Sequence, residues 1–296
     1  MLYIVCRLRV YGGASKTKLM AKILVVEDDP AIRAVIKETL ETADYTVATS
    51  SDGIEALERL RREEFDMMIC DVWMPRMGGL DLLRSLRVEA RTPPRVIVMT
   101  ADDTPQTVLE ALREQAYQYT AKPFDPITLL EQVERALELP EPLPIEILSA
   151  RPDWVELLVP CDLATADRIQ GFLAQLRADL PEEVRQNVGA AFREMLLNAV
   201  EWGGKLDPHR KVRIAYLRAK RMLLYRVADP GPGFRTDTLV HAAVNNPAGD
   251  PWGHIVAREQ KGLRPGGFGI LMARAMVDEV LYNEAQNEVV LIKYLD

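Results

Sequence analysis

Four short apolar runs, each followed at once by a chemically distinctive residue, constrain the fold of this chain more than any other feature. Runs of four or five apolar residues between polar or turn residues are typical of buried parallel strands. In an open parallel sheet, ligands bind outside the carboxyl ends of the strands. We therefore expect these residues to converge at one edge. The runs and their followers are Ile23–Val26 with Glu27, Asp28 and Asp29, Met67–Cys70 with Asp71, Val96–Met99 with Thr100, and Tyr119–Ala121 with Lys122.

Carboxylates gathered at one edge repel one another unless a hard divalent cation such as Mg²⁺ joins them. Asp29 has two interpretations at this stage. It is either a third carboxylate beside Glu27 and Asp28 or the cap of a helix that begins near Pro30.

This set resembles the receiver domain of two-component response regulators, a doubly wound, flavodoxin-like parallel sheet with helices. The resemblance implies that Asp71 is the phosphoacceptor and that an upstream histidine kinase is the partner that phosphorylates it. It also implies that Asp28, and Glu27 through water, hold Mg²⁺, with Asp71 itself and the carbonyl of Trp73 completing the metal site.

The same resemblance assigns roles to residues at the later strand ends. Thr100 would hydrogen-bond the phosphoryl oxygens, and Lys122 would pair with them across a cis bond to Pro123. Tyr119 occupies the aromatic switch position of the family. The alternative is an ordinary doubly wound domain with acidic loop ends. It does not account for four strands that each end, in the expected order, in the residue of a receiver motif.

Length and composition indicate a chain of two domains without a membrane or nucleic-acid role. A chain of 296 residues is long enough for about two cores. A net charge of −7 argues against an electrostatic nucleic-acid surface. No segment approaches the roughly eighteen apolar residues of a membrane span. Three scattered cysteines form neither a disulfide framework nor a zinc site, so we expect a cytoplasmic location.

The domain boundaries follow from local signals. Residues 1–20 are interpreted as an N-terminal extension, either an upstream start or a loosely ordered arm, because Met20 directly precedes the first strand. Residues 21–139 form the receiver, which ends with a helix over Pro126–Leu139. The Pro-rich stretch from Pro140 opens a linker over 140–153. Residues 154–296 then form the second domain.

The second domain is predicted to be an α+β two-layer sandwich, with helices on one face of a mixed sheet. Two helical patterns precede most of its strands, over Leu163–Ala178 and Glu182–Trp202. The predicted strands are Val155–Val159, Val212–Leu217, Met222–Ala228, Val280–Tyr282 and Val289–Tyr294.

Three short motifs carry the chemistry of the second domain. Glu194 and Asn198 are four residues apart, so they share one helix face. Asp229-x-Gly231-x-Gly233 follows a strand, and glycines let the backbone approach a ligand closely. Gly267-x-Gly269 opens a later helix, where backbone N–H groups and the helix dipole favour a phosphate. Thr236–Lys261, between these glycine motifs, is interpreted as a lid.

Together these motifs resemble the ATP-binding boxes of the Bergerat-fold (GHKL) ATPases, and most closely the anti-sigma-factor serine kinases. The resemblance implies that ATP binds with Mg²⁺ on Asn198, that Glu194 is the catalytic base and that Asp229 binds the adenine amino group. The cofactor-binding glycines would support the lid and phosphates; they are Gly231, Gly233, Gly267 and Gly269.

Two positions depart from the family pattern. Trp202 stands where a histidine often precedes the glycine that ends the helix of Glu194 and Asn198, and Asn287-Glu288 stands where the last strand often opens with Gly-Thr. These departures leave two output functions open. One is a serine/threonine kinase that phosphorylates an anti-sigma-factor antagonist, and the other is a module that sequesters a partner such as a sigma factor without turnover. A homodimer is also possible.

A sensor histidine kinase would use the same ATP-binding boxes. Such an enzyme needs a helical hairpin that carries a phosphorylatable histidine. The three histidines, His209, His241 and His254, all lie inside the ATP-binding domain, and the linker is too short for a hairpin. This interpretation is therefore rejected.

Overall fold

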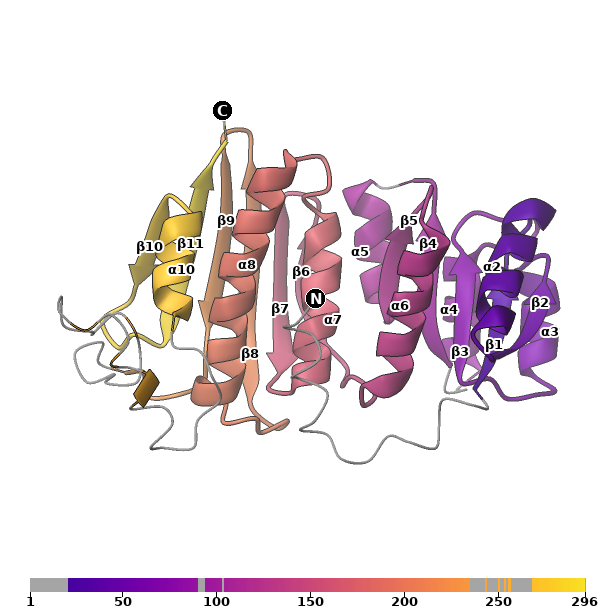
Figure 1. The fold of residues 1–296 in the computed structure, drawn as a ribbon, viewed down its shortest axis with the longest axis horizontal. Helices are drawn as coiled ribbons and strands as arrows, with labels where there is room; N and C mark the ends of the chain where they lie inside the picture. Colours follow the sequence, from indigo (N-terminus) through magenta and orange to yellow (C-terminus); the bar gives the residue numbers. More distant parts are fainter. Residues whose placement is uncertain are drawn as a thin grey trace. The chain divides into compact units, whose positions relative to one another are not determined.

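The computed structural model describes residues 21–89, 94–102, 104–234, 243, 250, 253, 255, 256 and 268–295. They form two compact units (Figure 1): the first runs to Glu141, apart from Thr104–Leu109, and the rest of the second begins at Pro142. No helix within these ranges is long and apolar enough to cross a membrane.

The first unit is built on a five-stranded sheet in the order β2-β1-β3-β4-β5. Each pairing is parallel, as the four apolar runs predicted. β3 is buried along its whole length, because helices cover both faces of the sheet. The strands are β1 (Lys22–Val26), β2 (Thr46–Ser50), β3 (Met67–Asp71), β4 (Arg95–Thr100) and β5 (Gln118–Ala121).

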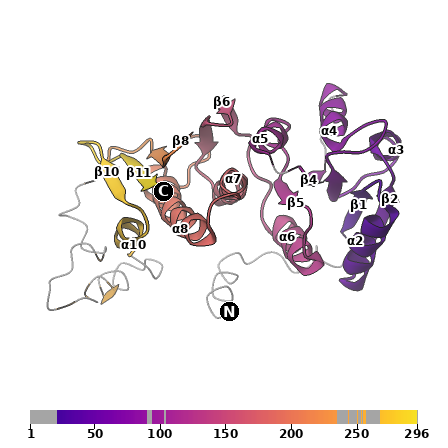
Figure 2. The ribbon, with the colours of Figure 1, turned by 90° about the horizontal axis from the view of Figure 1, so that it is seen from above.

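Five helices sandwich this sheet. They are α2 (Pro30–Thr42), α3 (Gly53–Leu60), α4 (Gly79–Val88), α5 (Pro105–Arg113) and α6 (Pro126–Glu138). Figure 2 shows α2 and α6 on one side of the sheet and α3, α4 and α5 on the other. The doubly wound parallel fold expected from the sequence is therefore confirmed.

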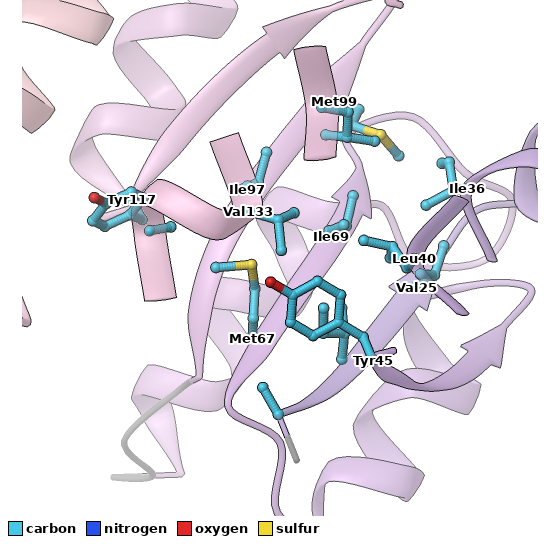
Figure 3. Close-up of a cluster of buried hydrophobic side chains, with 14 residues drawn as sticks. Val25, Ile36, Leu40, Tyr45, Met67, Ile69, Ile97, Met99, Tyr117 and Val133 are labelled. Atoms are coloured by element: carbon cyan, nitrogen blue, oxygen red, sulfur yellow. The ribbon is translucent and has the colours of Figure 1, made fainter. Parts of the chain in front are cut away.

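One core cluster of this unit lies between the sheet and the helices α2 and α6 (Figure 3). Leu40 of α2 and Val133 of α6 are fully buried against Ile69 and Ile97 of the central strands. Burying a side chain of this size contributes about 1.5–3 kcal/mol. This packing holds the strand ends in fixed positions.

Asp29 caps α2. Its Oδ1 accepts hydrogen bonds from the backbone N–H groups of Ala31, at 2.7 Å, and Ile32, at 3.1 Å. Pro30 occupies the first helical turn, where its missing N–H costs nothing. Of the two interpretations of Asp29, the cap is the one that the structure supports.

The second unit contains a six-stranded sheet in the order β10-β11-β9-β8-β7-β6. Every pairing in it is antiparallel, so our expectation of a mixed sheet was wrong. The strands are β6 (Glu146–Arg151), β7 (Trp154–Pro160), β8 (Lys211–Ala219), β9 (Met222–Ala228), β10 (Glu279–Tyr282) and β11 (Glu288–Tyr294).

The helices of this unit all cover one face of the sheet (Figure 2). The Phe192 ring of α8 packs on the Tyr225 ring of β9, with centroids 4.6 Å apart, which identifies that face. The helical elements are α7 (Leu163–Gln175), α8 (Glu182–Asn198), the π-helical turn η2 (Ala199–Gly203) and α10 (Gly269–Met276). The two-layer α+β sandwich is confirmed.

The second sheet begins earlier than we expected, because β6 lies inside the stretch 140–153 that we assigned to the linker. β6 is an edge strand, and every second or third residue of it is exposed. Its sequence therefore lacks a clear alternation of apolar and polar residues. On the first unit, Arg95 Nη1 donates to the Leu139 carbonyl at 2.9 Å. On the second, the Leu143 N–H donates to Thr165 Oγ1 at 2.9 Å. The connection between these anchors is only Pro140-Glu141-Pro142.

Candidate functional site

The first site is an acidic cluster at the carboxyl edge of the parallel sheet. Glu27 follows β1 and Asp71 ends β3, and the pairing of Val26 with Cys70 brings them side by side. One oxygen each from Glu27, Asp28 and Asp71 lies within 4.8 Å of the others. Glu27 and Asp71 are buried, whereas Asp28 is exposed. The sequence placed these three carboxylates together correctly.

Lys122 compensates part of this negative charge. Its Nζ lies 2.5 Å from Asp71 Oδ2 and 2.7 Å from Glu27 Oε2. Burial alone would lower the pKa of Lys122, but the hydrogen bonds to these two carboxylates outweigh it and raise the pKa. Burial also raises the pKa of Glu27, and the neighbouring Asp71 carboxylate adds to this, while Lys122 opposes it.

Three carboxylates share one ammonium group, so the cluster has the oxygen donors and the uncompensated charge that suit Mg²⁺. The residues present therefore fit a divalent cation.

The loop after β3 is folded tightly against Asp71. The Trp73 N–H donates to Asp71 Oδ1 at 3.1 Å, while the Trp73 side chain is 61% exposed. A Cβ at Gly79 would overlap the Asp71 carbonyl, and one at Gly78 would lie 2.5 Å from the Val72 carbonyl. The two glycines are therefore required for the loop to return so close to Val72 and Asp71.

Thr100 and Tyr119 both bond the backbone of Asp102, in the loop after β4. Thr100 is fully buried, and its Oγ1 accepts a hydrogen bond from the Asp102 N–H at 3.0 Å. The Tyr119 hydroxyl donates to the Asp102 carbonyl at 2.7 Å, with the ring buried. The peptide bond between Lys122 and Pro123 is cis, as we expected.

Sequence reasoning missed Arg33. Its Nη1 donates to the backbone carbonyls of Glu27, at 2.5 Å, and Asp28, at 3.2 Å. The guanidinium therefore fixes the acidic loop from the first turns of α2. The available signal was its spacing, four residues after Asp29 on a helix that starts at the loop.

The second site brings Glu194 and Asn198 of α8 to the start of α10. A Cβ added at Gly269 would lie 2.8 Å from Glu194 Oε2 and 3.4 Å from Asn198 Nδ2. The N-terminus of α10 therefore touches both side chains, and only glycine fits there without a shift. Three of the predicted site residues are thus brought together.

Asp229 lies at the end of β9 against the π-helical turn that continues α8. A Cβ at Gly203 would overlap the Asp229 carboxyl group. The Gly231 N–H donates to Asp229 Oδ1 at 2.7 Å. Burial raises the pKa of Asp229, and the hydrogen bond from Gly231 opposes this only in part. Sequence reasoning did not assign a role to Gly203, because the π-helical turn that carries it to Asp229 has no obvious pattern.

Gly233 and Asn287 complete this end of the site. Gly233 has φ +84°, and a Cβ there would overlap the Ala285 carbonyl, so the position requires glycine. Asn287 accepts the Asp229 N–H on its backbone carbonyl at 2.8 Å, and its Nδ2 donates to the Gly231 carbonyl at 3.0 Å.

Glu288 lies on the other face of the sheet. Its carboxylate pairs with Arg226 through two hydrogen bonds of 2.7 and 2.8 Å. Val289 and Val227 are buried towards the helices, and side chains alternate along a strand. Of the pair Asn287-Glu288, only Asn287 therefore lies beside Asp229. Gly267 and nearly all of the predicted lid over Thr236–Lys261 lie outside the described residues.

Comparison with known proteins agrees with this division of the chain. The response regulator receiver domain model matches residues 23–134, and the histidine kinase-like ATPase domain model matches residues 159–293. The DNA-binding response regulator MtrA of Mycolicibacterium smegmatis is 32% identical over 203 residues, which cover 67% of this chain and 87% of that protein. The response regulator MprA of Mycobacterium leprae is 36% identical over 121 residues, 41% of this chain and 53% of its own.

Among solved structures, the chemotaxis response regulator CheY4 of Vibrio cholerae is 35% identical and covers 40% of this chain and 99% of its own, with a TM-score of 0.38. The two domain matches and the similarity to MtrA show that the chain belongs to the response regulator family and consists of a receiver domain joined to a histidine kinase-like ATPase domain.

Proposed function

We propose that this protein is a response regulator phosphorylated on Asp71 that controls a serine/threonine kinase domain acting on a protein partner. The partner would resemble an anti-sigma-factor antagonist. The observation that carries the proposal is the contact of Glu194 with the start of α10 beside Asn198. A carboxylate held at a helix N-terminus that suits phosphate is placed where a base for phosphoryl transfer is needed.

The input reaction takes place at the first site. A carboxylate oxygen of Asp71 attacks the phosphorus of a phosphohistidine on an upstream kinase, and the P–N bond breaks as the imidazole keeps the electron pair. Lys122, now 2.5 Å from Asp71, pairs with the incoming phosphoryl oxygens. Thr100 donates its hydroxyl proton to one of them. Mg²⁺ held by Glu27, Asp28, Asp71 and the Trp73 carbonyl would neutralise the rest of the added charge.

The output reaction takes place at the second site. Glu194 accepts the proton of a serine or threonine hydroxyl on the partner as that oxygen attacks the γ-phosphorus of ATP. The bond between the γ-phosphorus and the bridging oxygen breaks, and ADP leaves with the electron pair. Asn198 would offer its amide oxygen to Mg²⁺, and Asp229 would accept a hydrogen bond from the exocyclic amine of adenine. Gly231, Gly233, Gly267 and Gly269 support the phosphates and the lid.

A second candidate function is nucleotide-dependent sequestration of a partner, such as a sigma factor, without phosphoryl transfer. The observation in its favour is Trp202, which is 46% exposed and precedes the glycine that packs on Asp229. An exposed indole beside a nucleotide site suits a protein partner. Glu194 favours the kinase, because a binder needs no base beside the metal.

Two experiments test these assignments separately. With a small phosphodonor and Mg²⁺, the wild-type chain should be labelled and Asp71→Asn should not; undiminished labelling would place the acceptor elsewhere. With radiolabelled ATP and candidate antagonist proteins, transfer should occur and be lost in Glu194→Ala. ATP-dependent association without transfer would instead establish the sequestering function.

A further inference from the structure

The face of the second sheet that lies opposite its helices carries a row of apolar side chains. Strand pairing places Trp154 beside Leu217, Leu217 beside Leu224, and Leu224 beside Ile292. Their neighbours along each strand are buried towards the helices, so these four project from the opposite face. We call them the apolar row; each member is half-buried.

Opposite charges end the apolar row. Arg151 of β6 pairs with Trp154 at one end, and Glu279 of β10 pairs with Ile292 at the other. Arg151 is exposed and forms no ion pair within the described part of the chain. Glu279 accepts a hydrogen bond from the Tyr294 hydroxyl at 2.5 Å. The row thus crosses all six strands from a cation to a carboxylate.

The rest of this face is locally neutral. Arg213 pairs with Glu156, and Arg226 pairs with Glu288, each at 2.7 Å. The chain as a whole carries a charge of −7, which would repel a second copy elsewhere on its surface. Here that repulsion is reduced, because the bases and acids balance.

Two further apolar side chains extend the surface near the row. Leu281 is 50% exposed and pairs with Val290, and Tyr294 is 53% exposed on β11. Figure 2 shows α7, α8 and α10 on the other side of the sheet. A continuous row of apolar side chains on a sheet face that these three helices leave uncovered is typical of an interaction site.

We propose that a second copy of this chain packs on this face about a two-fold axis that runs along the strands between β8 and β9. The axis exchanges β8 with β9, β7 with β11, and β6 with β10. It therefore sets Leu217 on Leu224 of the other copy, and Trp154 on Ile292. The charged ends meet as well, Arg151 against Glu279, and each contact occurs twice.

The order of residues along the apolar row, with opposite charges at its ends, favours a second copy of this chain as the partner. A partner must present an apolar row of the same length, with a carboxylate opposite Arg151 and a cation opposite Glu279. The chain itself meets this requirement, since reversing its own row produces the complement. Face-to-face packing of sheets about 10 Å apart and nearly aligned is a common arrangement, and a two-fold interface uses the same patch on both copies.

Charge exchange tests the proposal on the full chain, with the dissociation constant of the dimer measured by sedimentation equilibrium. Arg151→Glu or Glu279→Arg alone should weaken the dimer roughly tenfold or more, because two contacts become repulsive. The double variant should regain wild-type affinity, and so should an equimolar mixture of the two single variants. Arg151 and Glu279 of one copy lie about 24 Å apart across five strand spacings, so rescue within one copy is excluded.

Matched controls are Arg62→Glu and Glu284→Arg, which make the same charge changes at exposed positions away from the face. Leu217→Glu should yield a monomer, with circular dichroism confirming that the sheet is retained. A wild-type chain that stays monomeric at about 100 μM would overturn the proposal, since a specific interface of this kind binds well below that concentration. So would a dimer that Leu217→Glu leaves intact, or single variants that do not rescue one another.

Discussion

Gly269 opens α10 directly against Glu194, with no room for a side chain between them. A methyl group at Gly269 would lie 2.8 Å from Glu194 Oε2. On helix propensity alone, Gly269→Ala should stabilise the domain by up to about 1 kcal/mol. We expect the steric conflict to prevail, so that the carboxylate shifts and partner phosphorylation falls at least about tenfold.

The comparison variant for Gly269→Ala is Met272→Ala, at a 39% exposed position on the same helix. It should leave transfer unchanged. Thermal denaturation of both variants, together with initial rates of transfer, checks the prediction. A Gly269→Ala protein that is more stable and fully active would show that Glu194 does not need its observed position.

Asp229 should make nucleotide binding sensitive to acid. Burial raises the pKa of Asp229, so its carboxyl group takes up a proton at a higher pH than an ordinary aspartate does. The ionised form is the one that accepts a hydrogen bond from an exocyclic amine, and affinity should therefore fall as the pH drops through the raised pKa. Calorimetry with ADP across this range measures it. Asp229→Asn should bind more weakly but without that dependence, and a parallel decline in both proteins would contradict the assignment.

Asn287, and not Glu288, should affect nucleotide affinity. Asn287→Ala removes the hydrogen bond to the Gly231 carbonyl and should weaken ATP binding about three- to tenfold, as the loss of one hydrogen bond of about 1 kcal/mol implies. Glu288→Gln should leave ATP affinity unchanged, because its side chain lies with Arg226 on the opposite face. The reverse pattern in a titration would mean that the register of β11 at the site is wrong.

Tyr119→Phe should loosen the loop that carries Asp102. The variant loses the hydroxyl hydrogen bond to the Asp102 carbonyl while the buried ring keeps its packing. We expect about 1 kcal/mol of destabilisation and a change in the dephosphorylation rate of Asp71, because the N–H of the same residue, Asp102, bonds the Thr100 hydroxyl. Denaturant unfolding and the decay of labelled protein report the two effects. Equal lifetimes of the phosphorylated proteins would separate Tyr119 from the site.

The receiver site was predictable from sequence because a parallel sheet imposes a simple rule. Strands that run the same way end at the same edge, so Glu27, Asp71 and Lys122 converge wherever the loops lie. The pair Glu194 and Asn198 was predictable for a similar reason, since helical spacing alone fixes a shared face.

The remaining features depend on which face of a strand each side chain occupies and on where two backbone segments come close together. The sequence pattern indicates neither of these. The run Val289–Ile292 is apolar at every position, so it has no alternation to show which side chains face the helices. The sequence therefore did not show that Glu288 lies on the face away from the helices, and the open apolar face was not foreseen. Gly203 reaches Asp229 only because α8 ends in a π-helical turn, and the signal for such a turn is weak.

The three-residue connection Pro140-Glu141-Pro142 sets how the response of this protein scales with its abundance. Each ATPase domain is joined to its own receiver at an effective concentration in the millimolar range, as for modules joined by short linkers. Under the proposed function, the fraction of output domains under control would therefore equal the fraction of phosphorylated receivers, whatever the abundance of the protein. A change in expression level would alter the total output without altering the fraction of output domains under control.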